Sequence, residues 1–372
     1  MMIKNQKSNK HVALFISALR KGGSERVLVN LAEYLNQNGI RVTFVTQYDY
    51  PNEYELSSGI RRVFSEITEE ETSSNRLVNF VRRFQKLRNI WKTEKPDVIL
   101  SFIGKNNIMT VLTSRFLHIP VVVSVRGEPK EEYAARLMKL IVNPCFERAD
   151  GVVLQTKEAA DFFTEKVRNK SVTLKNPLNP DFARARYEGE RDKTVYAVGR
   201  VDANKNHEML IRAFAAVSKE FPEHRLTVYG KGECLENLRD LAEELGMQEK
   251  ISLPGAVNNV ADCIYKASAF VLCSYSEGMP NTLIEAMCMG IPSISTDCPC
   301  GGPAELIRDG ENGLLIPPGN QKALEQALRR MLGNPADAER MGRNAAKLLE
   351  EYRPEAVGDS WMEYLLSFCR EH

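Results

Sequence analysis

The sequence contains no long hydrophobic run and almost no excess of charge. Among its 372 residues, no stretch reaches the roughly 18 apolar residues that a membrane-spanning helix needs, and none near the N-terminus resembles a secretory signal. Lysine and arginine number 50 and aspartate and glutamate 49, which leaves a net charge of +1. Affinity for nucleic acid comes largely from positive charge, so this chain is a poor candidate for a nucleic-acid binder. We expect a cytoplasmic protein of about two domains.

The sequence also lacks the usual patterns of a metal site. Eight cysteines are present, but only Cys298 and Cys300 lie close together, and no second pair or histidine cluster completes a zinc site. Others, such as Cys145 and Cys273, stand among apolar residues, as buried thiols do in a reducing compartment. We therefore expect neither disulfides nor a bound metal ion.

Short β-favouring runs alternate with helical patterns in both halves of the chain, which predicts an α/β fold with parallel sheets. A polar, proline-containing stretch divides the two series. We expect an N-terminal domain over residues 1–175, a linker over 176–192, a second domain over 193–352 and a C-terminal helix over 353–372 that crosses back to the first domain. The predicted strands cover residues 11–16, 41–46, 97–102, 121–125, 151–155, 194–199, 225–230, 251–255, 269–273 and 293–296.

Two loops that follow predicted strands suit phosphate groups. Gly22 and Gly23 would let the backbone approach a ligand, and the helix behind them offers free N–H groups and a positive dipole end. Arg200 and Lys205 together could clamp a diphosphate, because arginine presents a fork of donors and lysine a point charge. The alternative interpretation of the glycine loop is a tight turn that binds nothing. The alternative interpretation of the loop with Arg200 and Lys205 is a solvated basic loop.

A third loop carries two carboxylates, Glu277 and Glu285, around the predicted start of a helix. Pro280 and Asn281 are residue types that open helices. Carboxylates beside free N–H groups suit a ligand that is both anionic and rich in hydroxyl groups. Glu285 alone is explained by attraction to the positive end of the helix dipole, and Glu277 alone is explained as a surface charge. Neither explanation accounts for the two carboxylates together.

Taken together, these loops resemble the family 4 retaining glycosyltransferases of the GT-B fold, over nearly the whole chain. The resemblance rests on Glu-x7-Glu, met by Glu277 and Glu285, on the Arg200–Lys205 pair and on the Gly-Gly loop. Further matches lie at residues 229–232, 253–257 and 310–315. The resemblance implies two Rossmann-like parallel-sheet domains that face each other across a deep cleft.

The resemblance also implies roles for individual residues. Arg200 and Lys205 would hold the nucleotide diphosphate, Glu285 the ribose hydroxyls and Glu277 the hydroxyls of the transferred sugar, while the turn from Pro254 to Val257 would contact the base. The remaining donor-binding candidates are Gly22, Gly23, Gly230, Gly232, Gly278, Met279, Pro280, Asn281 and Thr282.

The expected reaction moves a hexose or N-acetylhexosamine from a nucleotide sugar, UDP-linked, to a lipid-linked or polysaccharide acceptor. The sequence has no Asp-x-Asp, the pair with which metal-dependent transferases hold a cation. We therefore expect that the reaction needs no cofactor and that Arg200 and Lys205 stabilise the leaving diphosphate. The resemblance further implies that the anomeric configuration is retained, and we expect attack on the front face of the sugar.

The match departs from the family at one point. Many members carry a histidine after the valine-rich strand, where this chain has Arg126 and Glu128. Either residue could take over that role, or the role is absent. This variant, with Ser101–Asn107, resembles the subgroup that extends polyprenyl-diphosphate-linked glycans.

Residues 76–95 form an unusually basic predicted helix, with seven cations against Glu94 alone. A basic face attracts anionic lipid or a lipid diphosphate, so we expect peripheral attachment at the inner face of the cytoplasmic membrane. Residues 133–145 are a second interfacial candidate, although an ordinary half-buried helix explains them as well. The acceptor or membrane candidates are Arg82, Arg83, Lys86 and Lys105.

Other functions remain open on the sequence alone. A non-catalytic nucleotide- or phosphate-binding protein could use the same scaffold, although it would have no need of Glu277. A nucleotide-sugar epimerase needs an acid/base group, for which His207 is the available candidate. A two-carboxylate glycosidase has no use for a phosphate clamp.

Overall fold

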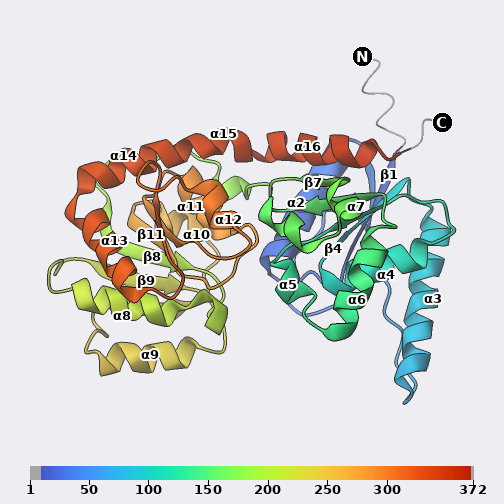
Figure 1. Cartoon of the computed structure of the whole chain (residues 1–372), viewed down its shortest axis with the longest axis horizontal. Helices are drawn as coiled ribbons and strands as arrows, with labels where there is room; N and C mark the ends of the chain where they lie inside the picture. The colour runs from blue at the N-terminus through green and yellow to red at the C-terminus, as the bar shows by residue number, and fades with distance from the viewer. Residues whose placement is uncertain (1–9, 370–372) are drawn as a thin grey trace. The chain divides into compact units, whose positions relative to one another are not determined.

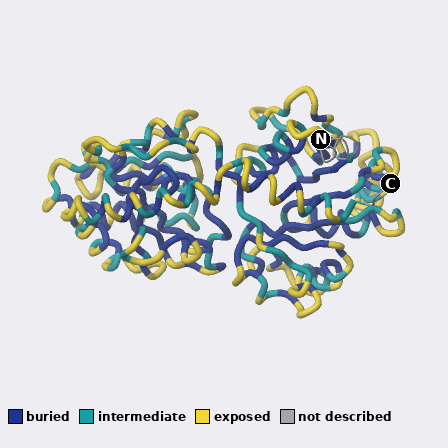
Figure 2. The backbone as a smooth tube through the Cα atoms, turned by 90° about the horizontal axis from the view of Figure 1, so that it is seen from above, coloured by how far each residue is buried: buried dark blue, intermediate teal, exposed yellow. Residues whose placement is uncertain are grey.

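The computed structural model describes residues 10–369 and divides into two compact units. The first consists of Met1–Pro177 with Glu355–His372, and the second of Leu178–Pro354. Each unit contains one parallel sheet with helices packed around it (Figure 1). Buried backbone runs through the interior of each unit, as Figure 2 shows.

The first unit is built on a seven-stranded sheet in the order β3-β2-β1-β4-β5-β6-β7, in which every pairing is parallel. All six residues of β1 are buried, because helices cover both faces of the sheet. The strands are β1 (His11–Ile16), β2 (Arg41–Thr46), β3 (Arg61–Phe64), β4 (Val98–Phe102), β5 (Val121–Ser124), β6 (Gly151–Leu154) and β7 (Ser171–Thr173).

The helices of the first unit include one from the far end of the chain, α16 (Pro354–Leu366). Its Trp361 is fully buried, contacts the ring of Phe102 and donates a hydrogen bond of 2.9 Å to the carbonyl of Lys175. The other helices are α2 (Gly23–Gln37), α3 (Arg76–Glu94), α4 (Gly104–Ser114), α5 (Pro129–Glu132), α6 (Arg136–Phe146) and α7 (Glu165–Arg168), with the 3-10 helix η1 (Glu158–Phe162).

The second unit is built on a six-stranded parallel sheet in the order β10-β9-β8-β11-β12-β13. Its strands are β8 (Asp192–Val198), β9 (Arg225–Tyr229), β10 (Ile251–Gly255), β11 (Ala267–Leu272), β12 (Ser293–Thr296) and β13 (Leu314–Ile316). Its helices are α8 (His207–Val217), α9 (Leu235–Glu244), α10 (Val260–Ile264), α11 (Asn281–Cys288), α12 (Gly302–Leu306), α13 (Gln321–Gly333), α14 (Pro335–Ala345) and α15 (Leu349–Tyr352), with 3-10 helices η2 (Pro180–Phe182), η3 (Ala203–Lys205) and η4 (Ala346–Leu348).

The structure differs from the expected organisation in two places. Residues 178–192, which make up most of the expected linker 176–192, belong to the second unit, and Leu178 and Phe182 are buried in its core. Three strands that the sequence pattern does not indicate, β3, β7 and β13, lie at sheet edges. β3 and β7 are short and partly exposed, so their sequences lack the continuous apolar run of the central strands, whereas β13 is apolar but only three residues long.

Among residues 10–369, no helix has both the length and the apolar character needed to cross a bilayer. All eight cysteines lie among the described residues, none of them is in a disulfide bond, and five of them are buried. In the same residues, no group of three or more histidine, cysteine, aspartate or glutamate side chains is arranged to hold a metal ion.

Candidate active site

The topology of the second unit places two predicted loops side by side. β8 and β11 are neighbours in the sheet, and the strand order reverses between them. The strand that follows β8 in the sequence, β9, lies on one side of this pair, and the strand that follows β11, β12, lies on the other side. Loops that leave the carboxyl ends of two such strands form the usual ligand-binding crevice of an open parallel sheet. The loop after β8 carries Arg200 and Lys205, and the loop after β11 carries Glu277.

The two loops meet in an ion pair between Lys205 and Glu277. The Nζ of Lys205 donates a hydrogen bond to Oε1 of Glu277, and the Oγ of Ser274 donates to the same oxygen at 2.6 Å. The two charged side chains are only 13% and 14% exposed. Each charge is therefore partly removed from water and is compensated by the other.

Asn204 fastens these loops together, and the sequence analysis did not identify it. Its Nδ2 donates to the carbonyl of Ser276 at 2.9 Å, and its Oδ1 accepts from the backbone N–H of Ser276 at 3.1 Å. Its own carbonyl accepts from the N–H of Tyr275 at 2.9 Å. An asparagine among polar loop residues gives no periodic signal, so only the fold reveals this role.

Arg200 lies apart from the Lys205–Glu277 pair. Its side chain is 76% exposed, and its guanidinium lies 3.3 Å from Asp202. Asp202 in turn accepts a hydrogen bond from the backbone N–H of Lys205 at 3.1 Å and so stabilises the turn that presents the lysine. The structure thus places the two predicted clamp cations on one loop, with only Lys205 half-buried.

The helix after Glu277 begins as the sequence predicts. α11 starts at Asn281, and Pro280, at its N-cap, has no side-chain oxygen to bond to the first turn. Gly278 and Met279 are buried, and Asn281 and Thr282 are half-buried. Glu285 is 4% exposed and lies in the second turn of the helix.

The predicted glycines after β9 have a packing role. A Cβ atom on Gly230 would lie 1.7 Å from the carbonyl oxygen of Gly199, and one on Gly232 would lie 2.1 Å from that of Val201. Their backbone therefore lies directly against the loop that bears Arg200. The turn after β10 joins this region through a 3.0 Å hydrogen bond from Gly230 to Gly255, with Pro254 exposed and Val257 half-buried beside it.

In the first unit, the corresponding sheet reversal lies between β1 and β4. Gly22 is the N-cap of α2 and Gly23 its first residue, so the Gly-Gly loop does open a helix. The loop after β1 is joined to α4 by a 2.9 Å hydrogen bond from Ser17 to Asn106. Lys105, on the same helix, is exposed.

The two candidates for the missing histidine have different environments. Arg126 is buried: its guanidinium lies over the ring of Phe102 and donates to Asn176, and burial lowers the pKa of Arg126 to about 9. Glu128 is half-buried, and partial burial raises the pKa of its carboxyl. Of the two, Glu128 has the greater access to solvent.

Glu132 is a second residue that the sequence analysis missed. Its carboxylate accepts hydrogen bonds from the backbone N–H groups of Gly104 at 2.6 Å and of Arg126 and Gly127 at 3.2 Å each. Burial raises the pKa of this carboxyl. Its position, at the end of the short helix α5, follows from no spacing in the sequence.

His207, the acid/base candidate for an epimerase, is buried at the start of α8 with 5% of its surface exposed. Burial and, secondly, the charge of Lys205 lower the pKa of His207 to about 4. Its ring is therefore neutral near pH 7 and shielded from a substrate, which does not suit the role.

The basic helix α3 has one buried and one exposed half. Leu87 and Trp91 are its buried residues, whereas Leu77, Phe80 and Val81 are 69%, 47% and 44% exposed. Among the acceptor candidates, Arg82 donates to the carbonyl of Glu71, Arg83 pairs with Glu66 at 2.7 Å, and Lys86 donates to the carbonyl of Glu66.

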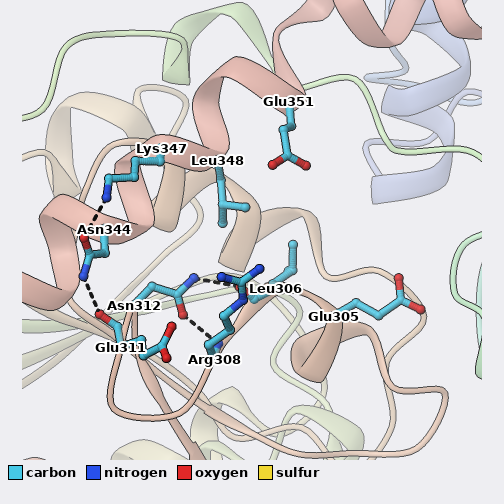
Figure 3. A pocket seen from close by; sticks show the side chains of 9 residues that line it. All are labelled: Glu305, Leu306, Arg308, Glu311, Asn312, Asn344, Lys347, Leu348 and Glu351. Atoms are coloured by element: carbon cyan, nitrogen blue, oxygen red, sulfur yellow. Dashed lines mark hydrogen bonds between the residues drawn. The ribbon is translucent and has the colours of Figure 1, made fainter.

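A cavity of about 500 Å³ lies elsewhere in the second unit (Figure 3). It lies between the α12–β13 region and the segment from α14 to α15, and Asn344 reaches across it to the carbonyl of Glu311 at 2.9 Å. It includes none of the predicted site residues; its lining consists of Glu305, Leu306, Arg308, Glu311, Asn312, Asn344, Lys347, Leu348 and Glu351.

Sequence comparison relates both units to known proteins. A family model described as Glycosyltransferase Family 4 matches residues 21–182, and one described as Glycosyl transferases group 1 matches residues 181–348. A Campylobacter jejuni protein described as GalNAc-alpha-(1->4)-GalNAc-alpha-(1->3)-diNAcBac-PP-undecaprenol alpha-1,4-N-acetyl-D-galactosaminyltransferase is 25% identical, over 95% of this chain and 98% of its own length. An uncharacterized glycosyltransferase of Haemophilus influenzae is 26% identical, over 95% of this chain and 99% of its own length.

Structural comparison finds the same fold in proteins of known structure. Anabaena Alr3699/HepE in complex with UDP superimposes with a TM-score of 0.79 at 15% identity and covers 96% of this chain and 100% of its own. WaaG, a glycosyltransferase involved in lipopolysaccharide biosynthesis, superimposes with a TM-score of 0.73 at 19% identity and covers 95% of this chain and 99% of its own.

Proposed function

This chain belongs to the group 1 glycosyl transferases of glycosyltransferase family 4, with two Rossmann-like units of the GT-B type, and on that premise we propose its donor, acceptor and mechanism. It moves a hexose or N-acetylhexosamine from a UDP-linked donor to a lipid-linked or polysaccharide acceptor, with retention of the anomeric configuration. The observation that carries this proposal is the Lys205–Glu277 pair at the sheet reversal of the second unit.

Known relatives support the two substrates. The Campylobacter jejuni relative is named for transfer of N-acetylgalactosamine to a saccharide on undecaprenol diphosphate. A relative in Erwinia amylovora, 22% identical over 92% of this chain, is named for amylovoran biosynthesis. HepE, which shares the fold, was solved with UDP and with UDP-glucose. A nucleotide-sugar donor and a glycan acceptor are consistent with these names, and we assign the donor to the second unit and the acceptor to the first.

In the proposed reaction, the bond between the anomeric carbon and the donor phosphate oxygen breaks while the acceptor oxygen bonds to the same face of that carbon. The departing phosphate oxygen takes the proton of the acceptor hydroxyl. Negative charge therefore grows on the diphosphate, where Lys205, Arg200 and the N–H groups at the start of α11 stabilise it. Glu277 orients the transferred sugar, and Glu285 binds the ribose hydroxyls.

The ion pair prepares both groups for these roles. Lys205 is held by the carboxylate it bonds, and Glu277 is held by Lys205 and Ser274 together. Because Asn204 joins the two loops, neither side chain has to be brought into place when the donor binds. Such preorganisation lowers the cost of reaching the transition state.

The reaction needs no metal ion or other cofactor in this proposal. The sequence has no Asp-x-Asp with which to hold a cation on the diphosphate, and Arg200 and Lys205 supply positive charge on one loop. Two cationic side chains can neutralise a diphosphate as a divalent ion would.

The acceptor reaches the protein from a membrane surface in this proposal. The exposed end of α3 combines Arg76 with Leu77, Phe80 and Val81, and Figure 1 shows one end of this helix reaching beyond the other helices of its unit. Cations beside apolar side chains suit the interface of an anionic bilayer. We place the enzyme peripherally at the inner face of the cytoplasmic membrane.

Nucleotide release tests the proposal directly. The purified protein is incubated separately with several UDP-, GDP- and ADP-sugars, with and without a bacterial membrane lipid extract, and released nucleotide is measured. We expect release from one or a few UDP-sugars that depends on the extract and is lost in Glu277→Gln. Release from no donor with any extract, or release equal in Glu277→Gln, would contradict the proposed transfer.

A further inference from the structure

The loop between β4 and α4 holds its backbone in an unfavourable conformation. Ile103 has φ +72° and Gly104, which begins α4, has φ +40°. Positive φ is a genuine outlier for a β-branched residue such as isoleucine, and it persists only where surrounding contacts impose it. Some group must therefore hold this loop in place.

The carboxylate of Glu132 supplies that contact. Its Oε1 accepts the N–H of Gly104 at 2.6 Å, directly after the strained residue. Its Oε2 accepts the N–H groups of Arg126 and Gly127, which belong to the loop after the neighbouring strand β5. One side chain thus connects the two loops at the carboxyl ends of β4 and β5.

The neighbourhood of Glu132 fixes the carboxylate in turn. Tyr133 is fully buried, and its hydroxyl accepts a 3.2 Å hydrogen bond from Asn107, which also donates to the carbonyl of Ser124 at 2.8 Å. Ser101 donates to the same asparagine at 2.9 Å. The end of α5 is therefore tied to both β4 and β5, and the carboxylate has little freedom to move away.

We propose that Glu132 is a positioning residue for acceptor recognition, an inference that rests on the proposed function of the enzyme. It fixes the positions of the two loops that present Lys105 and Glu128. It bonds to the backbone of these loops and not to either of these two side chains. Lys105 is exposed one residue after Gly104, and Glu128 is half-buried one residue after Gly127. The hydrogen bonds of the Glu132 carboxylate join segments of the first unit, to which the proposed function assigns the acceptor, so its role concerns the acceptor and not the nucleotide.

The substitution Glu132→Gln tests this role with little change of shape. Glutamine keeps one acceptor oxygen, but its NH2 group now faces a backbone N–H, so one of the two loops loses its partner. We expect the acceptor KM to rise, or kcat/KM for the acceptor to fall, about 10- to 100-fold, because small displacements of positioning groups have effects of that size. The donor KM and the affinity for UDP, measured by calorimetry, should stay unchanged.

A second readout does not depend on turnover. Amide hydrogen exchange should become faster in residues 103–107 and 126–128 of Glu132→Gln and stay unchanged around Lys205 and Glu277. Glu131→Gln, which changes an exposed carboxylate one residue away, is the matched control and should behave as the wild type. If Glu132→Gln does not fold, Glu132→Asp takes its place, since it keeps the charge and shortens the reach.

The outcomes separate this inference from the proposed function. A lower melting temperature with an unchanged acceptor KM would show that Glu132 only stabilises the fold, and this would overturn the inference. Equal losses for donor and acceptor, or unchanged exchange in both loops, would overturn it as well. A wild type that transfers no sugar would instead contradict the proposed function itself.

Discussion

Lys205 donates a hydrogen bond to the carboxylate of Glu277, across two loops that are 72 residues apart in the sequence. The pair is only partly exposed, so removing one charge leaves the other without compensation in a region of reduced solvation. The carboxylate also accepts from Ser274, and its remaining oxygen is therefore the better placed of the two for a sugar hydroxyl.

Glu277→Gln should nearly abolish transfer and leave nucleotide affinity mostly intact. Glutamine can still accept from Lys205 and Ser274 but no longer offers a charged acceptor to the transferred sugar. We expect kcat to fall about 100- to 1000-fold, while the affinity for UDP, measured by calorimetry, changes little. Equal losses of UDP binding and turnover would show that Glu277 serves the diphosphate instead.

Lys205→Ala and Arg200→Ala should each weaken transition-state stabilisation by about 2–4 kcal/mol, as the loss of one preorganised donor does. Steady-state kcat/KM with the best donor is the measurement. Lys205→Ala also leaves Glu277 unpaired, so Lys205→Ala with Glu277→Gln should cost less than the sum of the single changes. Additive effects would mean that the pair does not act as a unit.

The same two cations account for the expected behaviour in chelator. If Arg200 and Lys205 neutralise the leaving diphosphate, activity should survive excess EDTA in the wild type. Loss of activity in EDTA that Mg²⁺ or Mn²⁺ restores would refute the metal-free mechanism. Assaying Lys205→Ala with and without Mg²⁺ shows whether a metal ion can take the place of the lysine.

The sequence predicts the central strands of each sheet and the edge strand β10, but it misses the edge strands β3, β7 and β13. β1 and β5 are buried on both faces and appear as continuous apolar runs, whereas Arg61–Phe64 and Ser171–Thr173 are partly exposed edge strands without such a run. The loops with charged pairs and glycines could be located because they follow central strands.

The residues that organise those loops could not be found in this way. Asn204 and Glu132 act through hydrogen bonds to the backbone of segments distant in sequence, and such contacts leave no periodic pattern. His207 and Arg126 show what residue type alone does not reveal. Each has a residue type that suggests chemistry, but burial depends on the packing of neighbouring elements, and the fold buries both side chains.

Burial of His207 predicts a specific dependence of stability on pH. Its pKa is about 4 in the folded protein against an ordinary value of 6.5, so the unfolded chain binds the extra proton between these values. The free energy of unfolding should therefore fall as pH drops below about 6.5, and this group alone should contribute about 2 kcal/mol of loss by pH 5. Urea titrations at about pH 7.5 and pH 5 measure it.

His207→Gln should remove that part of the pH dependence, because glutamine does not titrate. His118→Gln, which changes an exposed histidine in the first unit, is the matched control. If wild type and His207→Gln lose the same free energy between the two pH values, the buried imidazole does not stay neutral as the structure indicates.

The membrane prediction has to be tested on the exposed end of α3. The sequence pattern predicts that charge reversal of Arg82, Arg83 and Lys86 would leave the fold unchanged. In the structure, however, these side chains make contacts with the segment before the helix. Arg83 pairs with Glu66, and Lys86 bonds to its carbonyl, so reversal would release the segment before the helix. A loss of vesicle binding in that variant would therefore combine the effect of the changed charge with the effect of the released segment.

Arg76 and the apolar side chains beside it give a cleaner test. Binding to vesicles that contain anionic lipid should fall steeply with salt, since attraction to the surface decays over a Debye length of roughly 8–10 Å. Arg76→Glu should weaken binding by about 1 kcal/mol or more. Leu77→Ser with Phe80→Ser should reduce the part of binding that salt does not remove, because these exposed side chains would enter the acyl boundary.

The control for the apolar change is Leu245→Ser, which alters a leucine of the second unit that is 38% exposed and far from α3 in sequence. It should bind vesicles as the wild type does. Flotation at low and high salt separates the electrostatic part of binding from the apolar part. Charge reversal of Arg76 acts on the electrostatic part, and the serine changes act on the apolar part. If neither change affects flotation, or if the wild type does not bind at low salt, α3 is a solvated helix.

The exposed Leu137 and Leu140 of α6 would then be the next surface to test, since they are 67% and 73% exposed beside Arg136 and Lys139.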